Sequence, residues 1–344
     1  MKKLLLIPVA AMLFAACSNE TENTDNDGPV PLQISVGNLD VSTEVATRAV
    51  NDAWEASDQI GVYALPTGTT TTPIAYGSNK YYTLTDETES TTATGGTVYK
   101  NFTGTNPVYL PANGSAIDVY GYYPYDGMTG VDGRVNATNP AAITLNVSDQ
   151  SSQKVIDFMT TGNSTTGKVQ WTDETLNEGQ SGYQTPITKA HAECKLLFKH
   201  RLCKLVFNLI AGNGMADTDF SGNTVTIGIA SMPTTATYNL YTSTISSVGT
   251  LGNIGTQNTD GASHKVFEAI IPPHTTAAAR EVTITIEKND PTSSATYTFN
   301  IDNNKTFTAG NKYIYNVTVN AKSLTVTAAI SPWGDGGTTS ATAN

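Results

Sequence analysis

The chain has 344 residues and an acidic balance, with 30 Asp and Glu against 19 Lys and Arg and a formal net charge of −11. Its basic residues form no cluster, and because a phosphate backbone is bound by clustered Lys and Arg, the composition argues against a nucleic-acid partner. The length is sufficient for two domains of ordinary size.

The first residues have the pattern of an export signal. Lys2 and Lys3 precede the apolar run Leu4 to Phe14, which is shorter than the roughly 20 residues of a membrane-spanning helix. Small residues then stand directly before Cys17, as in a lipoprotein signal, although Phe14 occupies the position where Leu is usual. We therefore expect residues 1–17 to be a lipoprotein signal with the lipid on Cys17, rather than a secretory signal with an incidental cysteine.

The next segment, Ser18 to Gly28, is acidic and carries no large apolar residue, which predicts a disordered tether. Beyond it, apolar and polar residues alternate with period two, which indicates half-buried antiparallel strands. The alternating apolar residues are Ile60 and Val62; Ile117 and Val119; Val225, Ile227 and Ile229; Val282, Ile284 and Ile286; and Tyr313, Tyr315, Val317 and Val319. With abundant Thr, Gly and Asn and no capped helical pattern, the chain is predicted to be all-β and built from β-sandwiches.

A polar stretch at residues 160–190 predicts a long loop or peripheral hairpin between two strand-rich regions. Strand signal restarts at Cys194, and the apolar parity then changes from even positions (Leu196, Phe198, Leu202) to odd positions (Leu205, Phe207, Leu209). A change of parity requires a bulge or a break near residues 200–204. On one uninterrupted strand Cys194 and Cys203 would point to opposite faces, so we expect two buried free thiols rather than a disulfide.

Six short motifs follow one another along almost the whole mature chain. They are Trp54-x-x-x-Asp58-x-Ile60-Gly61-Val62-Tyr63, Tyr120-Gly121-Tyr122-Tyr123-Pro124-Tyr125, Asp157-Phe158-Met159, Phe198-x-His200-x-Leu202-x-Lys204-Leu205-x-Phe207, Ala309-Gly310-x-x-Tyr313-x-Tyr315-x-Val317 and Trp333-Gly334. In this order they resemble the motifs of the fimbrillin family of pilins.

The resemblance implies two transthyretin-like antiparallel β-sandwich domains in tandem, which we assign to residues 49–189 and 190–344. It also implies export as an outer-membrane lipoprotein, processing by an Arg-specific protease, and polymerisation with other pilin subunits into cell-surface fimbriae that support adhesion. The subunits would be joined by donor-strand exchange, in which one subunit gives a β-strand to the next.

Residues 18–48 fit this scheme as a propeptide made of the tether and a removable strand. Leu32, Ile34 and Val36 alternate on one strand face, and the isolated Arg48 follows, with Ala49 as the first residue after the cut. Loss of the strand would leave a groove with unpaired backbone groups, which an incoming strand would fill. The alternative is a plain N-terminal strand with an incidental surface arginine.

The candidate donor strand lies near the C-terminus and carries Leu324, Val326 and Ile330 on its apolar face. The position of the subunit in the fimbria, as stalk, tip or anchor, stays open at this point.

No residue set predicts catalysis, a cofactor or a metal. His191, His200, His264 and His274 lack the spacing that sets two imidazoles toward one metal, and His200 is interpreted as a structural hydrogen-bonding residue. Asp58, Asp118 and Asp157 could supply a glycosidase pair, but each stands at a strand edge where Asp commonly serves a turn. We expect a structural protein rather than an enzyme.

An alternative function rests on the aromatic residues, since Trp54, Trp171, Trp333 and the run Tyr120 to Tyr125 could stack on sugar rings. The chain would then be a surface lipoprotein that does not polymerise, either a tip adhesin or a glycan-binding β-sandwich with a host or glycan ligand. Most of these aromatics are interpreted as core, and Trp171 is the exception because it lies in the polar stretch.

Overall fold

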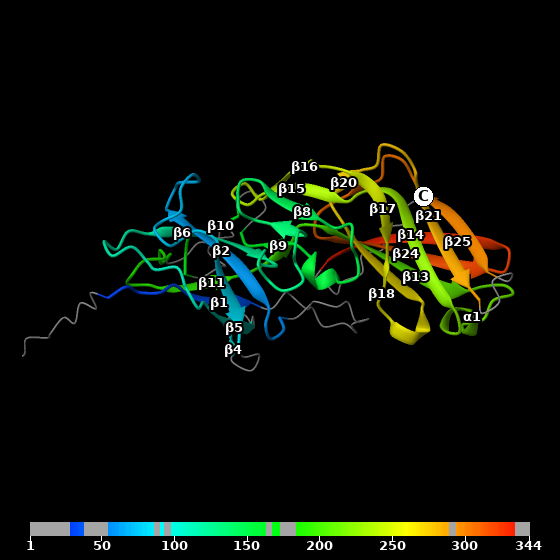
Figure 1. Ribbon diagram of the computed structural model, residues 1–344, viewed down its shortest axis with the longest axis horizontal. Helices are drawn as coiled ribbons and strands as arrows, with labels where there is room; N and C mark the ends of the chain where they lie inside the picture. The colour runs from blue at the N-terminus through cyan, green and yellow to red at the C-terminus, as the bar shows by residue number, and fades with distance from the viewer. Residues whose placement is uncertain are drawn as a thin grey trace, which may run out of the picture.

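The computed structural model describes residues 28–37, 54–85, 90–92, 98–162, 167–172, 184–288 and 294–333. In these residues the all-β prediction is confirmed: the helices are α1 (Thr218–Ser221) and the short 3-10 segments η1 (Gln153–Val155) and η3 (Gly261–Ser263). None of the described helices is long and apolar enough to span a bilayer. The molecule is elongated, with the N-terminal strands at one end and the C-terminal strands at the other (Figure 1).

The first sandwich combines two sheets. The larger sheet has the order β11 (Glu193–Leu196), β1 (Gln33–Gly37), β5 (Val98–Thr103), β3 (Lys80–Leu84), β2 (Gln59–Pro66), β6 (Ile117–Tyr123), β9 (Met159–Thr160) and β12 (Lys199–His200), with β4 (Ser90–Thr92) beside β5 and β10 (Lys168–Val169) beside β6. The smaller sheet has the order β16 (Thr244–Val248), β15 (Thr235–Asn239), β8 (Ile143–Asn146) and β7 (Val135–Asn136). The ring of Phe158 packs edge-on against Tyr238 between the sheets, with centroids 5.1 Å apart.

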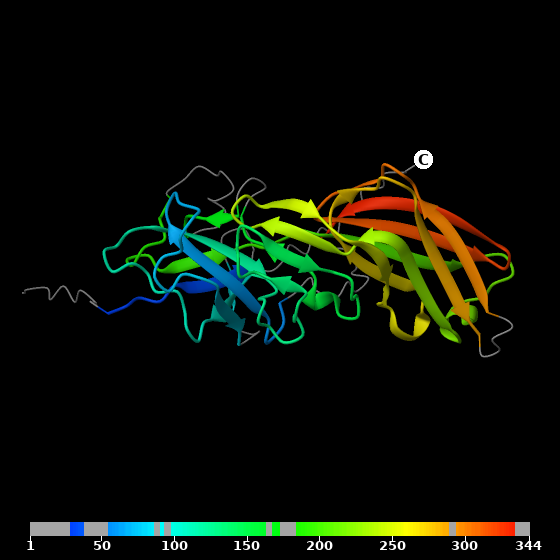
Figure 2. The ribbon, with the colours of Figure 1, turned by 45° about the horizontal axis from the view of Figure 1, so that its top comes forward.

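The second sandwich forms the other end of the molecule (Figure 2). One sheet has the order β18 (Gln257–Asn258), β19 (Val266–Ile271), β13 (Cys203–Ala211), β24 (Asn311–Asn320) and β25 (Ser323–Pro332). The other has the order β17 (Leu251–Gly255), β14 (Thr224–Pro233), β21 (Arg280–Glu287) and β22 (Ala295–Ile301), and a two-stranded ribbon joins β20 (His274–Thr275) to β23 (Thr306–Phe307). Phe207 and Phe299 pack between the two sheets with centroids 6.4 Å apart.

Most strand pairs are antiparallel, but β1 runs parallel to β11 and β13 runs parallel to β24. Parallel neighbours cannot be joined by a tight turn, so each of these pairs unites segments far apart in the sequence. The two parallel pairs therefore tie distant parts of the chain together, one in each sandwich.

The division between the sandwiches does not follow the boundary predicted at residues 189 and 190. The strands β11 and β12 lie after that boundary and belong to the first sheet, and the hairpin of β15 and β16 pairs with β8 in the first sandwich. Local periodicity identifies strands but not their partners, which are fixed by long-range packing.

The predicted break near residues 200–204 is confirmed. Strand β12 ends at His200 and β13 begins at Cys203, and between them the chain passes from the first sandwich to the second. The change of apolar parity therefore marks the point where the chain leaves one sheet and enters another.

The three long alternations also hold, since their apolar residues are buried on β14, β21 and β24. Strand β6 differs because every one of its residues is buried, not only alternate ones. It lies between β2 and β9, and a Cβ on its Gly121 would meet the side chains of Thr161, Phe198 and Leu196, so both of its faces are covered.

Cys194 on β11 and Cys203 on β13 are buried and form no disulfide with each other, as predicted. The two cysteines are kept apart because β11 belongs to the first sandwich and β13 to the second, and not only because of their odd spacing in the sequence. Burial raises the pKa of the Cys203 thiol far above its ordinary value, which makes it a packing residue rather than a nucleophile.

Candidate functional site

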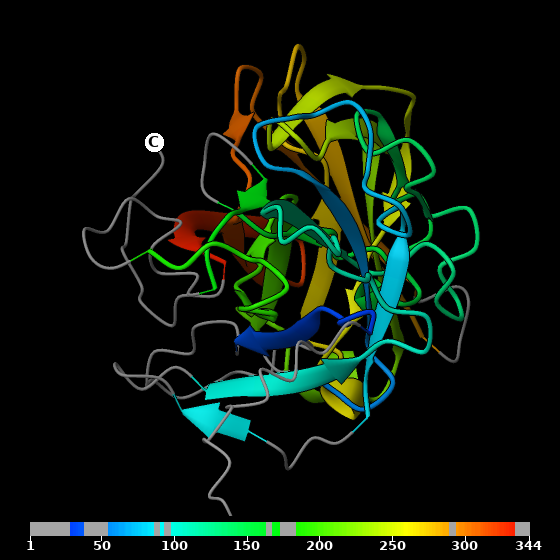
Figure 3. The ribbon, with the colours of Figure 1, turned by 90° about the vertical axis from the view of Figure 1, so that its left-hand side faces the viewer.

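Strand β1 occupies the slot between β5 and β11 in the larger sheet of the first sandwich. It is antiparallel to β5, with Ile34 opposite Phe102, and parallel to β11, with Ile34 opposite Cys194. In the described residues β1 is the link between these two strands, and an end view shows it beside β5 (Figure 3). Its removal would leave the facing edges of β5 and β11 without backbone partners, a costly arrangement for buried strands.

The side chains predicted for the removable strand all face the core. Leu32, Ile34 and Val36 are buried, with at most 3 % of their surface exposed, whereas Gln33 is exposed and Ser35 is half-buried. This is the alternation expected of a strand that covers a core with one face. The prediction of one apolar face on this strand is confirmed.

Tyr82 of β3 holds the beginning of this segment. Its hydroxyl donates to the carbonyl of Leu32 at 3.4 Å and accepts from the backbone N–H of Val108 at 3.0 Å. The N–H of Leu32 also donates to the carbonyl of Val108 at 2.8 Å. Burial raises the pKa of Tyr82 well above its ordinary value, so the phenol stays protonated and keeps its role as donor.

Trp54 holds the other end of β1. Its indole Nε1 donates to the carbonyl of Gly37 at 2.9 Å, and its ring packs edge-on against Phe102, Tyr123 and Phe198 with centroids 5.3 to 5.4 Å away. Because Trp54 follows Arg48 in the sequence, a cut after Arg48 would leave this donor with the body of the protein.

The aspartate of the same motif, Asp58, shapes the turn that carries Trp54. Its carboxylate accepts from the N–H of Glu55 at 2.8 Å and from the hydroxyl of Tyr123 at 3.2 Å, and it pairs with Lys154 at 2.8 Å. Burial, with the negative charge of Asp58 as a second cause, raises the pKa of Tyr123 well above its ordinary value.

The glycine of this motif, Gly61, is required by packing, since a Cβ there would lie 2.0 Å from the ring of Tyr122. Within the first motif, Trp54 therefore contacts β1 directly, whereas Asp58 and Gly61 fix the turn before β2 and the packing of β2 against β6.

Three of the predicted site residues, Cys17, Arg48 and Ala49, lie outside the described residues. The other three arginines of the chain are engaged in the folded part. Arg134 pairs with Asp149 and Arg201 donates to Thr160, while Arg280 is buried.

Strand β25, the candidate donor, is an edge strand bonded to β24 alone in its sheet. Its apolar residues Leu324, Val326 and Ile330 are half-buried and its Thr325 and Thr327 are exposed. Leaving the sheet would break one ladder of hydrogen bonds and expose these half-buried residues, which pack against the core. Strand β1, in contrast, is paired on both edges and fully buried on one face.

The junction between the sandwiches contains buried polar contacts. The amide of Gln150 accepts from the N–H of Ile270 at 2.8 Å and donates to the carbonyl of the same residue at 2.9 Å, which clamps the first sandwich to β19. Nearby, Lys204 and Glu268 form a buried ion pair at 3.0 Å. His200 makes a hydrogen bond with Asp157 through Nδ1 at 2.8 Å, so its prediction as a structural histidine is confirmed.

Each aspartate weighed for catalysis makes a structural contact. Asp58 caps the turn before β2, Asp118 accepts from the backbone N–H of Gly68 at 3.0 Å, and Asp157 bonds to His200. In the described part of the chain no three His, Cys, Asp or Glu residues lie close enough to hold a metal ion.

The aromatics weighed for sugar stacking are mostly core. Trp54, Trp333, Tyr120, Tyr122 and Tyr123 are buried, as the motif positions predicted. Trp171 is half-buried. The fully buried rings present no face on which a sugar could stack.

Sequence reasoning missed three contacts. The Tyr82 hydroxyl and the Trp54 indole N–H hold the two ends of the β1 segment, and the Gln150 amide joins the two sandwiches. Tyr82 and Gln150 belong to no motif, and nothing in their local sequence distinguishes them from other strand or loop residues. The motif predicts that Trp54 lies in the core, but its hydrogen bond is made to Gly37 at the end of β1, 17 residues earlier in the chain.

Comparison with known proteins agrees with this architecture. The sequence pattern of the family described as "Fimbrillin-like" matches residues 47–333. A curated protein of Bacteroides uniformis, named "Putative fimbrium subunit Fim1C", is 31 % identical, and the match covers 98 % of each chain.

Among solved structures, a "putative cell adhesion protein" from Bacteroides uniformis superposes with a TM-score of 0.61 at 25 % identity, over 90 % of this chain and 99 % of that one. Another, from Bacteroides ovatus, has the same fold, with a TM-score of 0.56 at 22 % identity over 89 % and 98 % of the two chains. The family pattern spans more than half of the chain, and the chain belongs to the fimbrillin-like family.

Proposed function

We propose that this protein is a pilin, a structural subunit of cell-surface fimbriae that support adhesion. In this proposal the chain is exported as an outer-membrane lipoprotein through Cys17, is cut after Arg48, and polymerises by donor-strand exchange. The Bacteroides uniformis relative named as a fimbrium subunit supports this assignment.

The observation that carries the proposal is the position of β1. The strand fills a slot between two strands of a sheet, its apolar face is buried in the core, and residues 38–53, which include Arg48, connect it to Trp54. A cut after Arg48 would leave β1 held by non-covalent contacts alone. Its departure would open a preformed slot of strand width with an apolar floor, which only another β-strand can fill.

The slot sets conditions on the incoming strand. A strand that takes the direction of β1 runs antiparallel to β5 and parallel to β11. It also has to carry apolar residues at alternate positions to replace Leu32, Ile34 and Val36. Strand β25 of a second copy meets the second condition with Leu324, Val326, Ala328 and Ile330. The Trp54 indole and the Tyr82 hydroxyl would then bind donor carbonyls in place of those of Gly37 and Leu32.

Cleavage should be selective for Arg48 even though the protease recognises only arginine. Arg134, Arg201 and Arg280 are tied to the folded part by an ion pair, hydrogen bonds or burial, and a protease needs an extended, accessible backbone. Arg48→Ala should therefore prevent maturation and leave the secondary structure unchanged.

The test is to treat the purified precursor with an Arg-specific protease and to look for high-mass ladders that resist mild detergent. A variant with Ile314→Cys and Ala329→Cys, a directly opposed pair near the C-terminal end of β25, would cross-link β25 to β24 after oxidation. Its matched control, Thr283→Cys with Thr298→Cys, would cross-link β21 to β22 in the opposite sheet.

Ladders in the control but not in the locked β25 variant would support the proposal. Ladders in both variants would exclude β25 as the donor. Clean cleavage at Arg48 with release of β1 and no polymer at high concentration would overturn the stalk-pilin function and favour the tip adhesin.

A further inference from the structure

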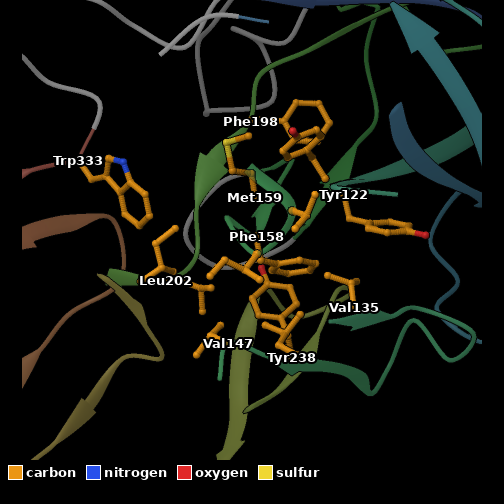
Figure 4. Packing of buried hydrophobic residues seen from close by; sticks show 14 of the residues in the cluster. Tyr122, Val135, Val147, Phe158, Met159, Phe198, Leu202, Tyr238 and Trp333 are labelled. Atoms are coloured by element: carbon orange, nitrogen blue, oxygen red, sulfur yellow. The ribbon is translucent and has the colours of Figure 1, made fainter. Parts of the chain in front are cut away.

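The large buried side chain at the end of β25 reaches beyond its own sheet. Trp333, the residue after β25, is 6 % exposed, whereas the apolar residues of the strand itself are only half-buried. Its backbone N–H donates to the carbonyl of Gly310 at 2.6 Å, and the N–H of Gly310 donates to the carbonyl of Leu202 at 2.9 Å. The indole thus lies at the junction, beside Leu202 at the margin of the buried cluster (Figure 4).

Trp333 reaches across to the first sandwich. Its ring stacks on the imidazole of His200, with centroids 4.0 Å apart and planes 7° from parallel. His200 belongs to β12, which pairs with β9 in the first sheet, and Asp157 fixes its ring through the 2.8 Å hydrogen bond at Nδ1. The ammonium of Lys204 lies 5.1 Å from the Trp333 ring, a cation–π geometry, and is held there by Glu268.

Strand β25 can separate from β24 most easily from its C-terminal end. A turn at Ala321 and Lys322 ties its beginning to β24, with Asn320 paired to Ser323, so the ladder opens most easily from the end that carries Trp333. The indole is therefore the first large contact that has to break when β25 leaves the sheet. Its removal would uncover His200, whose Nε2 is already buried without a hydrogen-bond partner, and the buried Lys204–Glu268 pair.

From this geometry we propose that Trp333 is a latch that retains β25 in its own sheet, and that its release from His200 governs how often the strand opens. The latch is a property of the single subunit. Its role in timing strand donation rests on the proposed pilin function, but the retention of β25 does not.

The test uses the uncut full-length chain and hydrogen exchange measured by mass spectrometry. Trp333→Ala should accelerate exchange in β25 peptides by a factor of at least about ten, because loss of a large buried aromatic generally exceeds the free-energy change that corresponds to a tenfold equilibrium shift. Exchange in β14 and β17, which lie in the opposite sheet, should be unchanged. The matched control, Leu324→Ala, removes a half-buried residue at the turn end of the same strand and should have a much smaller effect.

A second variant acts from the other side of the contact. His200→Gln keeps a polar group for Asp157 but removes the stacked ring, and it should accelerate β25 exchange even though residue 200 is not in the β25 sheet. If His200→Gln leaves β25 exchange at the wild-type rate, or if Leu324→Ala accelerates it as much as Trp333→Ala does, the latch is refuted.

A comparison of polymer formation with β25 exchange distinguishes the latch proposal from the pilin proposal. Faster β25 exchange in the variants, with no ladders from any cut protein, would uphold the latch and contradict the pilin function. Ladders from the wild type with unchanged exchange in both variants would uphold the pilin function and refute the latch.

Discussion

Replacing Ile34 by alanine tests whether β1 is held mainly by its buried face. Ile34 stands in the middle of the strand, between Phe102 on β5 and Cys194 on β11, and it is 3 % exposed. Because backbone ladders hold both neighbouring strands in place, the site has little freedom to collapse around a smaller residue. The truncation should therefore cost about 2–5 kcal/mol.

This cost is large relative to the whole apolar contribution of the strand. Burial of Leu32, Ile34 and Val36 stabilises the attached strand by roughly 4.5–9 kcal/mol in total, at roughly 1.5–3 kcal/mol for each side chain. Ile34→Ala should thus raise the population in which β1 is detached by roughly thirtyfold or more, since each 1.4 kcal/mol is a factor of ten. Hydrogen exchange of β1 and β11 peptides in the uncut chain would measure this population directly.

Ser35→Ala is the matched control, because Ser35 is the half-buried neighbour on the opposite face of the strand. Its effect should stay within about 0.5 kcal/mol. If Ile34→Ala and Ser35→Ala changed exchange equally, the backbone ladders rather than the apolar face would hold β1. If Ile34→Ala accelerated exchange in β21 and β22 as well, the effect would be global and the reasoning about a local slot would fail.

Three further predictions concern the junction, pH and the lipid anchor. Gln150→Leu leaves the N–H and carbonyl of Ile270 unpaired, and should lower the stability by about 1–3 kcal/mol for each buried group, measured by urea unfolding. Burial lowers the pKa of His274, so the unfolded chain takes up its proton first, and stability should fall as the pH drops below about 6.5. The His274→Gln variant should lose less stability over the same pH range. A stability profile identical to that of the wild type would refute the role of His274. Cys17→Ser should abolish labelling by palmitate, and persistent labelling would contradict the lipoprotein assignment.

The sequence alone was sufficient to predict the class of the fold and which face of many strands is buried. Alternation on Val225, Ile227 and Ile229 predicted which side of β14 faces the core, because successive side chains of a strand point to opposite faces. The parity change after Leu202 predicted the break between β12 and β13 for the same reason. The apolar face of β1 followed from Leu32, Ile34 and Val36 in the same way.

The partner of each strand was decided only in three dimensions. Nothing in the periodicity of β1 indicates that it lies between β5 and β11, about 65 and 160 residues further along the chain, or that the hairpin of β15 and β16 joins the first sandwich. The same holds for Trp333, which the sequence identifies as a motif residue but which acquires its place by stacking on His200. Period-two alternation reports which face of a strand is buried, whereas the choice of neighbour depends on packing and hydrogen bonding between segments far apart in sequence, which local patterns do not encode.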